Sequence, residues 1–93
     1  MPELTVYTRR GCHLCEVLIE ELMPLTRGRV RIHLRDVDRD PELVERYGLR
    51  VPVLEADGRV LCEARLDRPR VLEYLARCGA PAENGEPEPP GRL

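Results

Sequence analysis

The chain places two cysteines three positions apart, shortly after a β-branched and aromatic stretch, in TVYTRRGCHLCE. Residues 4–8, LTVYT, are β-branched and aromatic, which predicts a buried strand. From Cys12 onward the apolar residues change to helical spacing, and Pro24 predicts an end or a kink near the last turn of that helix. The predicted apolar stripe consists of Leu14, Val17, Leu18 and Leu22. The fold must therefore place a cysteine pair where a strand turns into a helix.

The next two predicted elements are a strand and a short helix. Residues 29–37, RVRIHLRDV, alternate arginine or histidine with apolar residues, which predicts a half-buried strand. Asp40 predicts an N-cap followed by proline at the first helical position, and Gly48 predicts the end of that helix. The apolar positions are Val30, Ile32 and Leu34 in the strand, and Leu43, Val44 and Tyr47 in the helix.

A hairpin and a last helix complete the pattern. Residues 51–64, VPVLEADGRVLCEA, form two strand-like runs around an Asp57-Gly58 turn. Asp67 predicts the cap of a helix that stops at Gly79. The predicted apolar face of this helix is Val71, Leu72 and Leu75.

The order of elements is thus β-α-β-α-β-β-α. A strand that connects through a helix to the next strand predicts a right-handed parallel pair, and the hairpin adds antiparallel strands. We expect an α/β fold with a mixed four-stranded sheet and helices on both faces. Residues 1–80 form the predicted single domain, and the Pro- and Glu-rich segment 81–93 is predicted to be disordered.

Composition narrows the function classes. All 15 basic residues are arginine, which excludes Schiff-base chemistry on a lysine, and the net charge is −2. Because acidic and basic residues are nearly equal in number, the composition does not predict a nucleic-acid-binding surface. No apolar run approaches the roughly 20 residues needed to cross a bilayer, and the first residues carry no signal-peptide pattern. We therefore expect a cytoplasmic, monomeric protein with mostly reduced thiols, in which a disulfide is more often catalytic than structural.

The cysteine pair has the chemistry of a dithiol centre. Cys12 falls at the predicted helix N-terminus, where unpaired amides and the helix dipole favour a thiolate and lower the thiol pKa. Cys15 lies one turn later and is more enclosed, so we expect Cys12 to attack a disulfide and Cys15 to resolve the product. His13, Arg9 or Arg10 would favour the thiolate. The alternative is that His13 is an exposed loop residue with no special role and that the arginines are simply solvated.

These features resemble the small glutaredoxin-like proteins of the thioredoxin-fold superfamily. TVYTRRGCHLCE is similar to their first strand and CxxC helix start, and DPELVERYGLRVPVL, residues 40–54, to their second helix and Val-Pro step. The resemblance implies a thioredoxin-like fold and a cis Val51–Pro52 bond beside the cysteines. It also implies that the Val51 backbone pairs with an extended substrate.

The sequence departs from the family in two places. His13-Leu14 replaces the dipeptide usual between the cysteines, and CEARLD lacks the Gly-Gly pair that precedes the last helix of glutaredoxins. Asp67 occupies the acidic position by that resemblance. Arg9, Arg50 and the Val51 backbone are candidates for holding a small peptide.

Three functions stay open. The first is a thiol-disulfide oxidoreductase that acts on protein or glutathione-mixed disulfides, without a bound cofactor, and is reduced by glutathione or a reductase. The second is a metal or iron–sulfur binder that uses Cys12, Cys15, His13 and Cys62. The third is a non-catalytic interaction module. Cys62 and Cys78 are interpreted as small hydrophobic residues, and a regulatory disulfide between them is the alternative.

Overall fold

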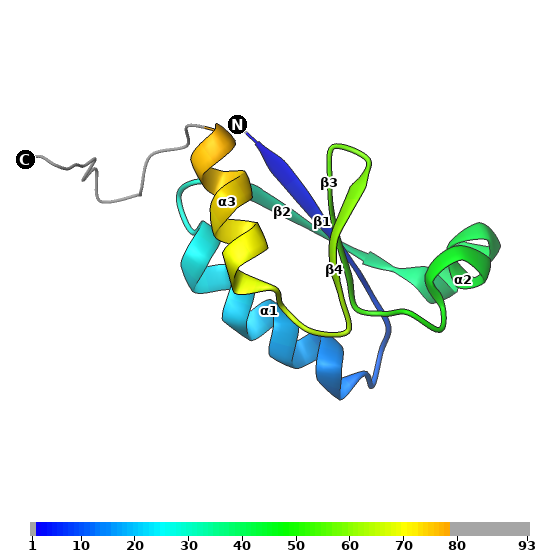
Figure 1. Cartoon of the computed structure of the whole chain (residues 1–93). Helices are drawn as coiled ribbons and strands as arrows, with labels where there is room; N and C mark the ends of the chain where they lie inside the picture. Colours follow the sequence, from blue (N-terminus) through cyan, green and yellow to red (C-terminus); the bar gives the residue numbers. More distant parts are fainter. Residues whose placement is uncertain (1, 79–93) are drawn as a thin grey trace, which may run out of the picture.

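The computed structural model describes residues 2–78 and forms the predicted order of strands and helices (Figure 1). The predicted tail, residues 81–93, lies outside the described residues. The elements in chain order are β1 (Glu3–Thr8), α1 (His13–Thr26), β2 (Arg31–Asp36), the 3-10 helix η1 (Val37–Arg39), α2 (Pro41–Tyr47), β3 (Val53–Ala56), β4 (Arg59–Glu63) and α3 (Arg68–Cys78).

The four strands form one mixed sheet in the order β2-β1-β3-β4. β1 and β2 are parallel, whereas β3 is antiparallel to both β1 and β4. The β3–β4 hairpin turns at Asp57 and Gly58, whose φ angles of 53° and 78° suit a tight turn of the kind that matches strand twist. The predicted sheet is confirmed.

Helices cover both faces of the sheet. Side chains from α1 and α3 share one apolar cluster with one face, where Leu4, Val6 and Leu54 are completely buried. On the other face, Tyr7 of β1 and Val53 of β3 contact a smaller cluster from η1 and α2. Figure 1 shows α1 and α3 side by side and the short α2 near one end of the sheet. Successive β1 residues alternate between the two cores because strand side chains alternate between faces.

The predicted helix caps are present. The Asp40 carboxylate accepts the N–H of Glu42 at 2.9 Å, and the Asp67 carboxylate accepts the N–H of Arg70 at 3.2 Å. Pro24 lies in the last turn of α1, which ends two residues later at Thr26, so the predicted end of this helix is confirmed.

Four apolar residues predicted to lie in the core are instead exposed. Their exposed fractions are 48% for Leu14, 58% for Leu34, 40% for Val44 and 40% for Leu72. Leu34 is exposed because β2 is an edge strand with one neighbour in the sheet. The short α2 buries only Leu43 and Tyr47, whereas Leu14 and Leu72 lie at the margin of the buried sides of α1 and α3. The residues that take their places in the core are Cys15 in α1 and Tyr74 in α3.

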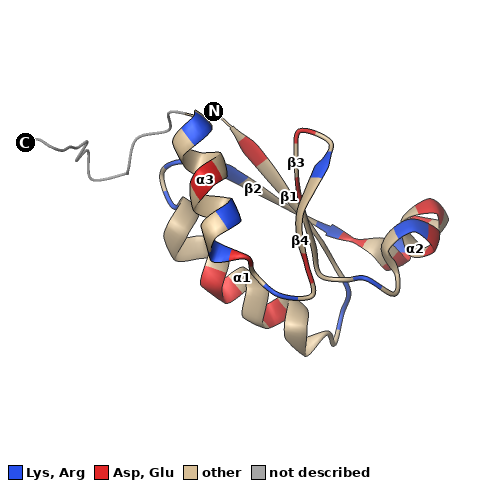
Figure 2. Ribbon diagram, viewed as in Figure 1, with Lys and Arg blue, Asp and Glu red and all other residues tan. Residues whose placement is uncertain are grey.

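Acidic and basic positions are spread over all parts of the described fold (Figure 2). Among the helices within residues 2–78, none has the length and apolarity needed to span a membrane.

Candidate functional site

Cys12 is the N-cap of α1, as the sequence predicts. Its N–H donates to the carbonyl of Arg9 at 3.2 Å, which closes the turn after β1. Its own carbonyl accepts the N–H of Glu16 at 3.2 Å, and its Sγ accepts the N–H of Cys15 at 3.1 Å. The sulfur thus occupies the position where a helix N-terminus accepts an anion.

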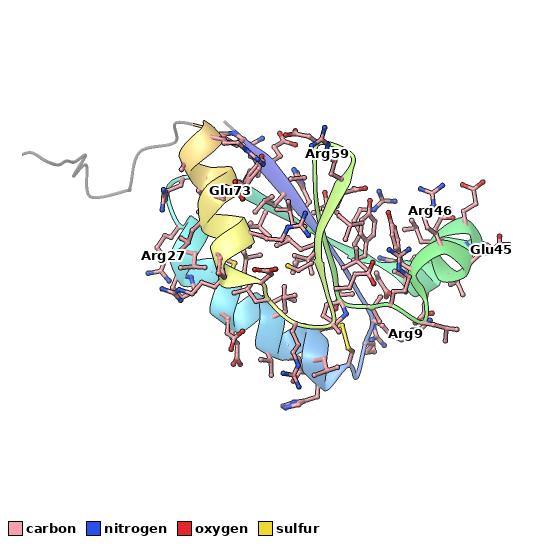
Figure 3. The ribbon with its side chains drawn as sticks, in the orientation of Figure 1. Arg9, Arg27, Glu45, Arg46, Arg59 and Glu73 are labelled. Carbon is pink, nitrogen blue, oxygen red and sulfur yellow. A yellow bond between two sulfur atoms is a disulfide. The ribbon has the colours of Figure 1, made fainter. Side chains whose placement is uncertain are left out.

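Cys12 and Cys15 are joined by a disulfide, drawn in yellow in Figure 3, with their Cα atoms 5.2 Å apart. Cys15 is 1% exposed, whereas Cys12 is half-buried at the surface. Cys12 is therefore the accessible cysteine of the pair, and the buried Cys15 contacts a partner only through the disulfide with Cys12.

The Val51–Pro52 peptide bond is cis, which confirms the expectation from the family resemblance. Val53 pairs with Tyr7 across the antiparallel β1–β3 ladder, so the proline lies at the same end of the sheet as the last residues of β1 and the cysteine turn. The N–H of Val51 donates to the carbonyl of Tyr47 at 3.0 Å. The Val51 N–H is therefore already bonded within the protein, and the expected pairing of the Val51 backbone with a substrate stays a prediction.

The guanidinium of Arg9 contacts the protein itself. Nε and Nη2 donate to the two carboxylate oxygens of Asp38, at 3.0 and 2.9 Å, and Nη1 donates to the carbonyl of Gly48 at 2.9 Å. The carboxylate raises the pKa of Arg9, and the guanidinium lowers the pKa of Asp38. The expected substrate-binding role of Arg9 stays a prediction, and these contacts compete with it.

Two other predicted site residues are placed at the surface. The Arg50 guanidinium forms an ion pair with Glu63 and lies over the Tyr47 ring, 5.3 Å from its centroid. His13 is largely exposed, with Nδ1 4.0 Å from a carboxylate oxygen of Glu16. The role of His13 beside the thiolate stays a prediction.

A tyrosine pair on the α2 side of the sheet was not predicted. The rings of Tyr7 and Tyr47 stack with centroids 4.4 Å apart, and both hydroxyls donate to the carboxylate of Glu55, at 2.9 and 3.4 Å. Burial and the hydrogen bond to Glu55 raise the pKa of Tyr7 to about 12. The one signal in the sequence is Glu55, an acidic residue inside the apolar run VPVLEA. A charged side chain on a strand that packs against two apolar cores needs a hydrogen-bond partner.

Cys62 and Cys78 lie at opposite ends of α3. Cys62 is buried on β4 beside the Asp67 cap, and burial raises the pKa of its thiol. Cys78 is exposed at the last residue of α3. The 11 residues of this helix extend over roughly 16 Å, so a disulfide between the two cysteines cannot form in this fold.

The turn between β4 and α3 differs from the glycine pair of glutaredoxins. Ala64 has a φ of 66° and donates its N–H to the carbonyl of Pro52 at 2.8 Å, which joins this turn to the cis-proline segment. An open depression of about 390 Å³ separates the turn from α1 and accounts for the exposure of Leu14. Its lining residues are Leu14, Val17, Leu18, Glu21, Ala64, Arg65 and Leu66.

Within residues 2–78, the histidine, cysteine and acidic side chains form no group of three or more that could hold a metal ion. The proposed ligand set of Cys12, Cys15, His13 and Cys62 is not assembled in this fold. One of its members, Cys62, is instead part of the apolar core beneath α1 and α3.

Solved structures share this architecture. Protein Ne2328 from Nitrosomonas europaea is 36% identical over 80% of this chain and 92% of its own, with a TM-score of 0.71. Protein XcR50 from X. campestris is 36% identical over 80% of this chain and 96% of its own, with a TM-score of 0.63. A mutant thioredoxin from Halobacterium salinarum is 26% identical over 81% and 72%, with a TM-score of 0.55. The fold is that of the thioredoxin-like proteins.

The family model described as "Glutaredoxin-like domain (DUF836)" matches residues 3–76. The chain belongs to this glutaredoxin-like family. Comparison with curated proteins gives no match.

Proposed function

We propose that the protein is a thiol-disulfide oxidoreductase in which Cys12 is the nucleophile and Cys15 the resolving thiol. The observation that carries the proposal is the cysteine pair itself, disulfide-bonded at the N-terminus of α1 with one sulfur accessible and the other buried. Membership of the glutaredoxin-like family and the cis Val51–Pro52 bond at the same end of the sheet support it.

The reaction follows from this asymmetry. The Cys12 thiolate of the reduced protein attacks one sulfur of a substrate disulfide, forming a mixed disulfide and releasing the other sulfur as a thiolate that takes up a proton. Deprotonated Cys15 then attacks Cys12 and releases the second substrate thiol. Two electrons pass from the dithiol to the substrate, and the protein is left with the Cys12–Cys15 disulfide.

The helix terminus favours the first step. The N–H of Cys15 points at the Cys12 sulfur, and the α1 dipole adds partial positive charge there. Both interactions stabilise a thiolate more than a neutral thiol, which lowers the thiol pKa and increases the reactive fraction at neutral pH.

Substrates and reductants complete the proposal. An extended segment beside the substrate disulfide donates an N–H to the carbonyl of Val51, as in strand addition. The disulfide belongs to a protein or to a glutathione adduct, and glutathione or a reductase returns the protein to its dithiol form. We propose a cytoplasmic monomer that binds neither nucleic acid nor membrane, since the cytosol supplies these reductants.

The test combines redox titration with two serine variants. In poised glutathione buffers, alkylation and mass spectrometry should find Cys12 and Cys15 converting together between about −300 and −180 mV. Cys12→Ser should lose disulfide reduction, Cys15→Ser should accumulate mixed disulfides, and Cys78→Ser, on the far helix end, should match the wild type. Reduction by Cys12→Ser at the wild-type rate would contradict the assigned roles.

A further inference from the structure

Three parts of the site that are distant in sequence meet at Arg9. Its guanidinium bonds Asp38 of η1 through two N–H groups and the Gly48 carbonyl through a third, 29 and 39 residues away. Its backbone carbonyl accepts the N–H of Cys12. Figure 3 labels Arg9 between the start of α1 and the segment that follows α2. One residue thus links the cysteine turn to both segments.

Gly48 begins the segment that leads into the cis proline. Residues 48–51 contain no regular strand or helix, yet the N–H groups of Arg50 and Val51 both donate to the carbonyl of Tyr47, at 2.8 and 3.0 Å. The segment is therefore fixed to the end of α2. Its first carbonyl, that of Gly48, is the one that accepts the N–H of Arg9.

The position that contacts Arg9 has no room for a side chain beside the α2 backbone. A Cβ atom at Gly48 would lie 2.4 Å from the backbone oxygen of Val44 and 3.4 Å from Nη2 of Arg9. The φ angle of Gly48, −54°, is one that any residue adopts, so space and not conformation excludes larger residues. The Val44 carbonyl therefore requires glycine at this position, and the guanidinium of Arg9 lies at an ordinary contact distance from where a Cβ would be.

We propose that Arg9 is a positioning residue that holds the segment before Val51–Pro52 against the turn that carries Cys12. This rests on the proposed function and deepens it. The guanidinium serves the protein's own carbonyl and the Asp38 carboxylate, not a substrate anion and not the thiolate. A planar group with several fixed donors suits this task, because it bonds a carboxylate through two N–H groups while a third points to a carbonyl.

The first test needs no activity. Amide hydrogen exchange at Arg50 and Val51 should be about tenfold faster in Arg9→Gln, Arg9→Lys and Asp38→Asn than in the wild type. Each variant weakens the hydrogen bonds by which Arg9 joins Asp38 and Gly48. Lysine keeps the positive charge, but its ammonium group cannot reproduce the fixed set of N–H donors of the guanidinium. The control is Arg10→Gln, since Arg10 is exposed and has no hydrogen bond or ion pair within residues 2–78. Its exchange should be unchanged.

The second test uses two disulfide peptides, one with an acidic flank and one without. The three variants should lose about tenfold in kcat/KM on both peptides, because a displaced segment misplaces any substrate. The pKa of Cys12, read from thiolate absorbance in a Cys15→Ser background, should match that of the parent.

Other outcomes overturn the proposal. If Arg9 held a substrate carboxylate, Arg9→Gln would affect the acidic peptide alone and Asp38→Asn would be harmless. If Arg9 stabilised the thiolate, Arg9→Gln would raise the pKa of Cys12. A wild-type protein inactive on both peptides would refute the proposed function, and amide exchange would still decide the positioning role. If Arg9→Gln does not fold, the test uses Asp38→Asn instead, because the Asp38 side chain is half-exposed and its replacement disturbs the core less.

Discussion

Replacement of Gly48 by alanine tests whether this site depends on space alone. The added Cβ would lie 2.4 Å from the Val44 carbonyl oxygen, closer than real Cβ atoms approach any heavy atom. That oxygen belongs to the α2 backbone and accepts the Gly48 N–H at 2.8 Å, so relief requires displacement of the main chain. Overpacking of this kind costs about 1–3 kcal/mol. Since the φ angle suits alanine, no conformational cost is added.

We expect Gly48→Ala to lower the free energy of unfolding by about 2 kcal/mol and the Tm by roughly 8–16 °C, on the scale of a domain this small. The assay is urea unfolding of the oxidised protein, in which the midpoint should fall by about 1 M without a change in slope. Gly58→Ala is the matched control. Its Cβ would meet open space, but its φ of 78° makes alanine strained, which costs about 1 kcal/mol. A Gly48→Ala variant within about 0.5 kcal/mol of the wild type would refute the reasoning.

Three further predictions use single side chains. Ala64→Gly should raise the free energy of unfolding by about 0.5–1 kcal/mol in urea unfolding, because glycine tolerates the φ of 66° better; a destabilised variant would contradict this. In the oxidised protein at pH 8, Cys78 should alkylate at least about tenfold faster than Cys62, whose thiol is buried with a raised pKa, by mass spectrometry; equal rates would indicate that β4 opens readily. Because the pKa of Tyr7 is raised to about 12, above its ordinary value of 10.0, its contribution to stability is complete below pH 10 and is lost as the pH rises through 12. Between pH 9 and 12 the unfolding free energy should therefore fall by about 2 kcal/mol more in the wild type than in Tyr7→Phe. Equal falls would show that Tyr7 is not the group responsible.

The position of the dithiol could be read from the sequence because its causes are local. The strand before Cys12, the helical spacing after it and the three-residue step to Cys15 all act within a few turns of the chain. The helix caps at Asp40 and Asp67 were predictable for the same reason, since each carboxylate accepts a hydrogen bond from an N–H two or three residues later in the chain. Val51–Pro52 could be placed because the family resemblance supplied its conformation.

The partners of individual side chains could not be predicted in this way, because they lie far away in the sequence. Nothing near Arg9 in the sequence indicates Asp38 or Gly48, which reach it only once β1, η1 and α2 are assembled at one end of the sheet. The stacking of Tyr7 on Tyr47 depends in the same way on which face of β1 the short α2 covers.

The sequence by itself determined the order of elements, the cysteine pair and the caps, because backbone hydrogen bonding and side-chain periodicity act over short stretches of chain. The tertiary structure alone decided that Leu34 is exposed on an edge strand, that Cys62 and Cys78 are separated by the length of α3, and that the Arg9 guanidinium is directed to the protein's own main chain. These outcomes depend on which strands are neighbours and on how far each helix reaches, and such long-range geometry is defined only when the whole sheet has formed.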